Sequence, residues 1–290
     1  MTAALNFYQA MALALLQGIT EFLPVSSSGH LVLARRLFGW SDDGGLVFDT
    51  VLHAGSLLAI LIYFWRDWLE ICRAYFLRSK IENRPPKAGP PLAEKSVIEN
   101  SDSAYYRRLP WLIIIATIPV VIAGPFLQPF LESGEEIRNA GATGVSMIMT
   151  AFIFFLAEHH GRADGKERIN FLNALFIGCM QIVALLPGAS RSGWTASAGI
   201  LCGQKRENAV RFAFLMAVPA IAGAIIFQAK DIIGMPQTGL NPALILSGFT
   251  ASFVASLFAI HFCLKYFRNH SLKPFAAYLL AIGIVALLIK

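Results

Sequence analysis

The chain has 290 residues, of which 56% are hydrophobic and only 14% are charged, and its formal net charge is +6. Soluble domains carry roughly 25% charged residues, so this composition excludes an ordinary soluble enzyme and predicts an all-α polytopic integral membrane protein. The basic residues fall mainly in connections between apolar segments, which indicates membrane topology and no nucleic-acid partner.

The first part of the chain predicts one interrupted pair of helices followed by full spans. Apolar segment 5–23 ends at Pro24, and a shorter apolar segment, 31–40, follows a polar turn. Non-helical backbone at membrane depth is tolerated only where protein or a water-filled cavity satisfies it, so this pair predicts a re-entrant helix-turn-helix hairpin. A spanning helix needs roughly 20 apolar residues, and three segments approach that length: 46–63, 111–131 and 141–157.

The second part of the chain repeats this order. Segments 171–186 and 194–203 flank a polar turn at Pro187 and predict a second re-entrant hairpin. Three further segments predict transmembrane helices and bring the total to about six: 209–227, 243–264 and 275–289.

The basic connections predict how the chain is oriented across the membrane. The longest polar stretch, 66–108, is rich in Lys and Arg and is predicted to be a cytoplasmic loop, irregular across NRPPKAGPP at 83–91. With the basic connections in the cytoplasm, both termini lie outside and the two hairpins enter from opposite faces. Arg35 and Arg36 oppose this assignment, because it places them outside.

Opposite entry predicts a single membrane domain, 1–290, built from an inverted repeat. The first repeat would cover 1–160 and the second 161–290. QGITEFLPVSSSG at 17–29 resembles QIVALLPGASRSG at 181–193, with a spacing that differs by one residue. Such repeats bring two broken helices together near the bilayer midplane.

Glu21 is the main candidate acid of the first polar cluster. A carboxylate within an apolar segment is costly and indicates a functional site. The alternative is a glutamate at the membrane surface or paired with an arginine. Gln17 lies one turn earlier on the same helical face, where a substrate contact and helix packing are equally compatible with its side chain.

Three serines and a histidine follow the proline. A half-helix that begins near Ser27 would direct free N–H groups and the hydroxyls of Ser26, Ser27 and Ser28 into the turn, as in an anion site. The alternative is an ordinary N-cap. His30 completes a set in which a serine nucleophile, a base and an orienting acid lie within ten residues.

The second cluster, PGASRSGWT at 187–195, adds a permanent cation. The planar guanidinium of Arg191 suits bidentate binding of phosphate or carboxylate, and Ser190, Ser192 and Thr195 can donate to the same anion. The alternative is an arginine that only neutralises Glu21. Together the clusters predict phosphoryl transfer or anion handling, with His30 or Glu21 taking the serine proton.

These two motifs resemble the signatures of the undecaprenyl pyrophosphate phosphatase family, known for bacitracin resistance. The family element [E/Q]-x-x-x-E is met by Gln17 and Glu21, and it continues as FLPVSSSGH at 22–30. The family signature P-G-x-S-R-S-x-x-T is met in full at 187–195. The resemblance extends through VFDTVLHAGS at 47–56 and FAFLMAVPA at 212–220.

The resemblance implies hydrolysis of undecaprenyl pyrophosphate to undecaprenyl phosphate on the periplasmic face of the bacterial inner membrane, which recycles the lipid carrier of peptidoglycan synthesis. It implies that Glu21, His30 and Arg191 are essential, and that Ser27 is the nucleophile. Diphosphate contacts implied in the same way are Ser26, Ser190, Ser192 and Thr195, and Gln17 is expected as a further substrate contact.

The resemblance also implies support by a divalent cation, Mg²⁺ or Ca²⁺. Gln17 departs from the relatives that carry glutamate there, so Glu21 is the only carboxylate of its element, and Asp49 or water would have to complete a coordination shell. Membrane lipid is an expected partner, and the sequence allows a homodimer.

Two other classes of membrane protein share features with these motifs. The acid-phosphatase-like lipid phosphatases share a serine-glycine-histidine element, but they need a histidine after the arginine, where this chain has Ala196, Ser197 and Ala198. A transporter of polyprenyl phosphate is the alternative from another class, because inverted repeats with broken helices often bind anions and alternate access.

Overall fold

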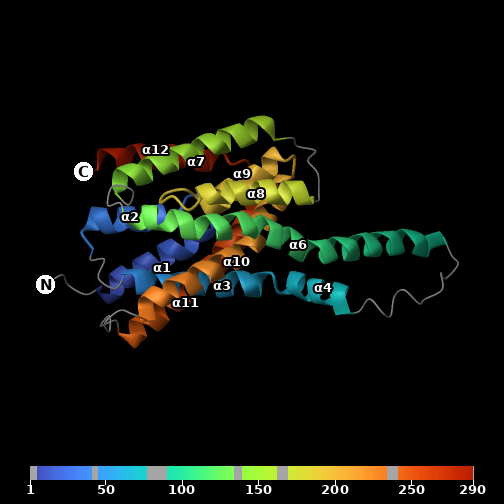
Figure 1. Ribbon diagram of the computed structural model, residues 1–290, viewed down its shortest axis with the longest axis horizontal. Coiled ribbons are helices and arrows are strands. Elements are labelled where there is room, and N and C mark those ends of the chain that lie inside the picture. Colours follow the sequence, from blue (N-terminus) through green and yellow to red (C-terminus); the bar gives the residue numbers. More distant parts are fainter. Residues whose placement is uncertain are drawn as a thin grey trace.

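The computed structural model describes residues 5–40, 45–76, 90–133, 139–161, 169–233 and 241–289. Every regular element in these ranges is an α helix, so the predicted all-α class is confirmed (Figure 1). The helices are α1 (Phe7–Phe22), α2 (Ser27–Phe38), α3 (Gly45–Tyr63), α4 (Trp65–Phe76), α6 (Pro90–Ser133), α7 (Ala140–His160), α8 (Phe171–Val183), α9 (Arg191–Leu201), α10 (Arg206–Ile233), α11 (Pro242–Tyr266) and α12 (Lys273–Leu288).

Five helices in the described ranges are long and apolar enough to cross a membrane. They are α3, α7 and α11 with the segments Ala104–Leu127 of α6 and Arg206–Ala229 of α10. Five of the six predicted spans are thus confirmed as candidates. The sixth is α12, an apolar helix of 16 residues, which falls short of the length that a perpendicular crossing needs.

The predicted irregular loop at 83–91 is only partly testable, because residues 77–89 lie outside the described ranges. Its last two residues, Pro90 and Pro91, begin helix α6, so the prediction is wrong there. Proline is tolerated in the first turn of a helix, where its missing N–H would have had no intrahelical partner.

Both predicted breaks occur, and each uses the same capping arrangement. α1 ends at Phe22 and α2 begins at Ser27, while α8 ends at Val183 and α9 begins at Arg191. Ser26 Oγ accepts the backbone N–H of Gly29 at 3.3 Å, and Ser190 Oγ accepts that of Gly193 at 3.2 Å. A serine N-cap therefore starts each second half-helix.

The two turns meet inside the bundle. Gly188 has φ 87°, and a Cβ there would lie 2.4 Å from the carbonyl oxygen of Thr143 on α7. Its N–H donates to Ser28 Oγ at 3.5 Å, across 160 residues of sequence. Only glycine satisfies both the left-handed backbone and this approach, so Gly188 lets the second turn reach the first.

Around these turns, α1 packs on α11, α11 on α3, α6 on α8, and α7 on α12. Figure 1 shows α7 and α12 side by side along one edge of the bundle, while α4 and the first part of α6 extend from one end.

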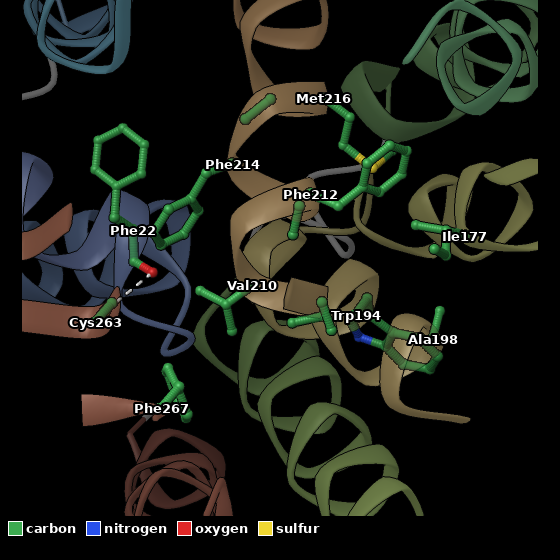
Figure 2. Close-up of a cluster of buried hydrophobic side chains, with 14 of the residues drawn as sticks. Phe22, Ile177, Trp194, Ala198, Val210, Phe212, Phe214, Met216, Cys263 and Phe267 are labelled. Atoms are coloured by element: carbon green, nitrogen blue, oxygen red, sulfur yellow. Dashed lines mark hydrogen bonds between the residues drawn. The ribbon is translucent and has the colours of Figure 1, made fainter. Parts of the chain in front are cut away.

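A buried aromatic core supports both turns (Figure 2). Phe22, the last residue of α1, packs edge-to-face on Phe214 of α10 with ring centroids 5.3 Å apart. Trp194 lies in the first turn of α9, is buried, and donates its indole N–H to Thr150 Oγ1 at 3.0 Å. The polar residues of both turns are thus attached to aromatic anchors that cannot shift without opening the core.

Candidate active site

An ion pair joins the two turns. An Arg191 terminal amino group donates to Glu21 Oε1, linking residues 170 positions apart. The Glu21 side chain is only 4% exposed and that of Arg191 is 21% exposed. The pairing that the sequence left as an alternative is therefore present, and it brings the two sequence motifs into one site.

The second oxygen of Glu21 receives two further donors. Ser27 Oγ lies 2.6 Å from Glu21 Oε2, and Gln17 Nε2 lies 2.7 Å from the same atom. An ionised carboxylate can only accept, so the Ser27 hydroxyl must donate its proton to this bond. The Ser27 hydroxyl therefore points its proton at a carboxylate. This is the geometry expected of a nucleophile hydrogen-bonded to a base.

His30 is fixed by other partners. Its Nδ1 lies 2.7 Å from the Ser26 carbonyl oxygen, and its Nε2 lies 2.8 Å from the hydroxyl of Tyr278 on α12. Both ring nitrogens are engaged by groups other than Ser27. The sequence left open whether His30 or Glu21 is the base for Ser27. The geometry favours Glu21.

The remaining predicted contact residues surround the pair but already have partners. Ser26 and Ser190 cap α2 and α9. Ser192 Oγ donates to the Leu23 carbonyl at 3.3 Å, and Thr195 Oγ1 donates to the Arg191 carbonyl at 2.8 Å. Their hydroxyls hold the turns together, and a role in binding diphosphate stays a prediction.

Two residues that the sequence did not assign lie against the site. His53 of α3 places Nε2 3.7 Å from Glu21 Oε2, with its Nδ1 held at 2.8 Å by the Asp49 carbonyl oxygen. Tyr278 contacts His30 as described above. An available signal for His53 was a histidine one turn after Asp49 within an apolar span, since titratable residues in such spans indicate function.

The residues do not fit a cation held by protein groups alone. The carboxylate oxygens of Asp49, a candidate second ligand, accept hydrogen bonds from the Arg35 guanidinium at 2.6 and 2.9 Å. Glu21 has both oxygens occupied. Among the residues that the structure describes, no group of three or more His, Cys, Asp or Glu side chains could hold a metal ion.

Comparison with known proteins identifies the family. The model of the bacitracin resistance protein BacA family matches residues 10–285. The undecaprenyl-diphosphatase of Mycobacterium marinum is 36% identical over 293 residues, covering 99% of this chain and 95% of the relative. That of Thermomicrobium roseum is 36% identical over 294 residues, covering 98% of each. Undecaprenyl-diphosphatase 1 of Corynebacterium jeikeium is 37% identical over 288 residues, covering 98% of this chain and 94% of the relative. The chain, with its several candidate spans, therefore belongs to the BacA family of multi-pass membrane proteins.

Proposed function

We propose that this protein hydrolyses undecaprenyl pyrophosphate to undecaprenyl phosphate and inorganic phosphate, and so recycles the lipid carrier of peptidoglycan synthesis and confers bacitracin resistance. One observation carries the proposal: the Ser27 hydroxyl donates to Glu21, which is also paired with Arg191. The nucleophile and the phosphate-binding cation thus both bond to the carboxylate that acts as the base. The names of the full-length relatives support the same reaction.

In the first step, Ser27 Oγ attacks the terminal phosphorus and its proton passes to Glu21. The new Ser27 O–P bond forms as the bond from that phosphorus to the bridging oxygen breaks, and undecaprenyl phosphate leaves. Protonated Glu21 no longer attracts Arg191 as an anion. The guanidinium is then free to stabilise the charge on the phosphoryl oxygens.

In the second step, water attacks the phosphorus, the Ser27 O–P bond breaks, and inorganic phosphate leaves. Glu21 returns its proton to the Ser27 oxygen. Predicted additional diphosphate contacts are Gln17, Ser26, Ser190, Ser192 and Thr195.

The proposed topology is an inverted repeat, 1–160 and 161–290, with re-entrant hairpins α1–α2 and α8–α9. Reciprocal packing supports it: α1 of the first half packs on α11 of the second, and α8 of the second packs on α6 of the first. The described residues of the stretch 66–108 belong to α4 and α6, so the prediction of a loop is wrong there. With this basic stretch in the cytoplasm of a bacterial inner membrane, the site would open to the periplasm. Arg35, which opposed this orientation, is neutralised by Asp49.

We keep a divalent cation, Mg²⁺ or Ca²⁺, as part of the proposal, with no step assigned to it. Water would supply most of its ligands, and Glu21 would bind it only by giving up one of its present donors. Removal of divalent ions with a chelator followed by stepwise addition tests this directly. A homodimer also stays a prediction, tested by the mass of the detergent-solubilised protein.

The central experiment measures phosphate release from undecaprenyl pyrophosphate by purified protein. Wild-type protein and Ser247→Ala should release phosphate, whereas Ser27→Ala should not. Ser247 is a suitable control because its hydroxyl donates only to the Leu244 carbonyl on its own helix. Release that persists in Ser27→Ala would show that the nucleophile is wrong. Absence of release, together with movement of labelled polyprenyl phosphate across vesicles, would favour the transporter.

A further inference from the structure

The turn that carries His30 holds its neutral ring in one tautomer. The Ser26 carbonyl oxygen accepts the His30 backbone N–H at 3.2 Å and lies 2.7 Å from His30 Nδ1. A carbonyl oxygen can only accept, so Nδ1 carries the proton. In the neutral ring, Nε2 is then the nitrogen with a free lone pair.

Tyr278 occupies that lone pair. Its hydroxyl lies 2.8 Å from Nε2, and the two rings are parallel within 7° with centroids 5.7 Å apart. A phenol both donates and accepts, so it can donate to neutral His30 and accept from the protonated ring without moving. The contact spans 248 residues of sequence and depends on how α12 is placed.

Close packing fixes α12 on α7, the helix that also contacts the second turn. A Cβ on Gly144 of α7 would lie 2.6 Å from the Gly283 carbonyl oxygen, so α7 and α12 approach closely there. Thr143, the preceding residue of α7, contacts Gly188 of the second turn. The position of Tyr278 is thus set by the same helix that supports the turn carrying Arg191.

The reaction moves two protons, one from Ser27 and one from water. Ser27 already donates to Glu21, which accounts for the first. The His30 ring bonds the Ser26 carbonyl and the Tyr278 hydroxyl, and its basic nitrogen, Nε2, is the one that bonds Tyr278. This separation indicates that the two bases serve different steps.

We propose that Tyr278 relays to His30 Nε2 a proton from the water that hydrolyses phosphorylated Ser27. The proposal rests on the proposed function. The water O–H bond breaks, its oxygen bonds to phosphorus, and the Ser27 O–P bond breaks. The water proton passes to the Tyr278 oxygen as the Tyr278 hydroxyl proton passes to Nε2, so Tyr278 changes from donor to acceptor. Glu21 returns its proton to Ser27, and His30 releases the added proton to solvent when phosphate leaves.

The test compares Tyr278→Phe with Tyr63→Phe. Tyr63 is a matched control, because its hydroxyl lies 3.1 Å from Nδ1 of another histidine, His261, outside the site. In Tyr278→Phe, steady-state phosphate release should fall by about 10-fold, roughly the effect of one neutral hydrogen bond. The ratio kcat/KM should be unchanged, because it reports the attack of Ser27 and not the later hydrolysis. The first-turnover burst of undecaprenyl phosphate should remain, and phosphoserine should accumulate at Ser27.

Mass spectrometry of the acid-quenched protein measures the phosphoserine, and thermal unfolding in detergent checks the fold. His30→Gln should accumulate the same intermediate more strongly, and Tyr63→Phe should resemble wild type. Wild-type turnover in Tyr278→Phe, or a fall without phosphoserine in a folded variant, would overturn the proposal. Failure of the proposed function is a separate result, since wild-type protein would then release no phosphate.

Discussion

Ser27 Oγ lies 2.6 Å from Glu21 Oε2 across the turn that separates α1 from α2. The hydroxyl and the carboxylate belong to different half-helices, and the break at Pro24 lets them face one another. The geometry needed for proton transfer therefore exists before substrate arrives, so little reorganisation is required for attack.

Replacing Glu21 with glutamine should lower kcat by about 10²- to 10⁴-fold, the range typical of a lost general base. The amide keeps the shape of the side chain but cannot take the Ser27 proton. Phosphate release from undecaprenyl pyrophosphate measures the effect. Glu207→Gln is the control, because Glu207 pairs with Arg268 at the surface. Equal activity of the two variants would remove Glu21 from the proton-transfer role.

Replacing Arg191 with lysine should lower kcat by about 10²-fold or more, the cost of losing a donor aimed at transition-state charge. An ammonium is a point charge and cannot reproduce the planar fork. Arg268→Lys, an exposed partner of Glu207, serves as the control. Near-normal turnover of Arg191→Lys would exclude a bidentate role.

Replacing Gln17 with glutamate should preserve activity and change its dependence on divalent cations. Gln17 Nε2 now donates to Glu21 at 2.7 Å, whereas a glutamate would put a second carboxylate beside the first. Two close carboxylates repel unless a proton or a cation lies between them. Titration of activity with Mg²⁺ and Ca²⁺ measures the change. An identical profile would show that Gln17 only packs.

The helix breaks could be predicted from sequence because local chemistry determines them. Pro24 and Pro187 lie within the breaks that follow α1 and α8, and Ser26 and Ser190 cap the next half-helices. The long α6 could not be predicted in full. Its first turns are polar, so apolar periodicity carries no signal there, and the two prolines at its start look like loop residues.

Only those site residues that belong to the two motifs could be predicted from the sequence. Glu21 and Arg191 stand out because charges within apolar segments are costly. Tyr278 has no such signal, since tyrosine is common at membrane interfaces, and its role depends on packing between α7 and α12. His53 lies in a stretch that the resemblance included, but only the fold shows that it faces Glu21.

Replacing His53 with leucine should lower activity by about 10-fold, since a polar neighbour of the Glu21 carboxylate is lost and its environment becomes less polar. His53→Gln, which keeps a polar side chain, should retain more activity. His160→Leu is a matched control: its Nδ1 bonds the Leu156 carbonyl one turn back, as that of His53 bonds Asp49. Equal activity of His53→Leu and His160→Leu would contradict a role for His53.

The crossing of α1 and α11 gives a prediction about stability. A Cβ on Gly18 would lie 2.5 Å from the Ser252 carbonyl oxygen and 2.7 Å from Ala255 Cβ, so the helices must separate to accept it. Gly18→Ala should therefore destabilise the fold by about 1–3 kcal/mol, the usual cost of overpacking. Because Gln17 and Glu21 flank this crossing, activity should fall together with the thermal unfolding temperature.

Gly223→Ala provides the control, because a Cβ there meets no atom within 4 Å. Alanine in a helix interior is more favourable than glycine by roughly 0.5–1 kcal/mol, so this variant should unfold at the same or a higher temperature. Thermal unfolding in detergent compares the two alanine variants directly. A Gly18→Ala protein as stable as Gly223→Ala would mean that α1 and α11 do not approach as closely as the structure has them.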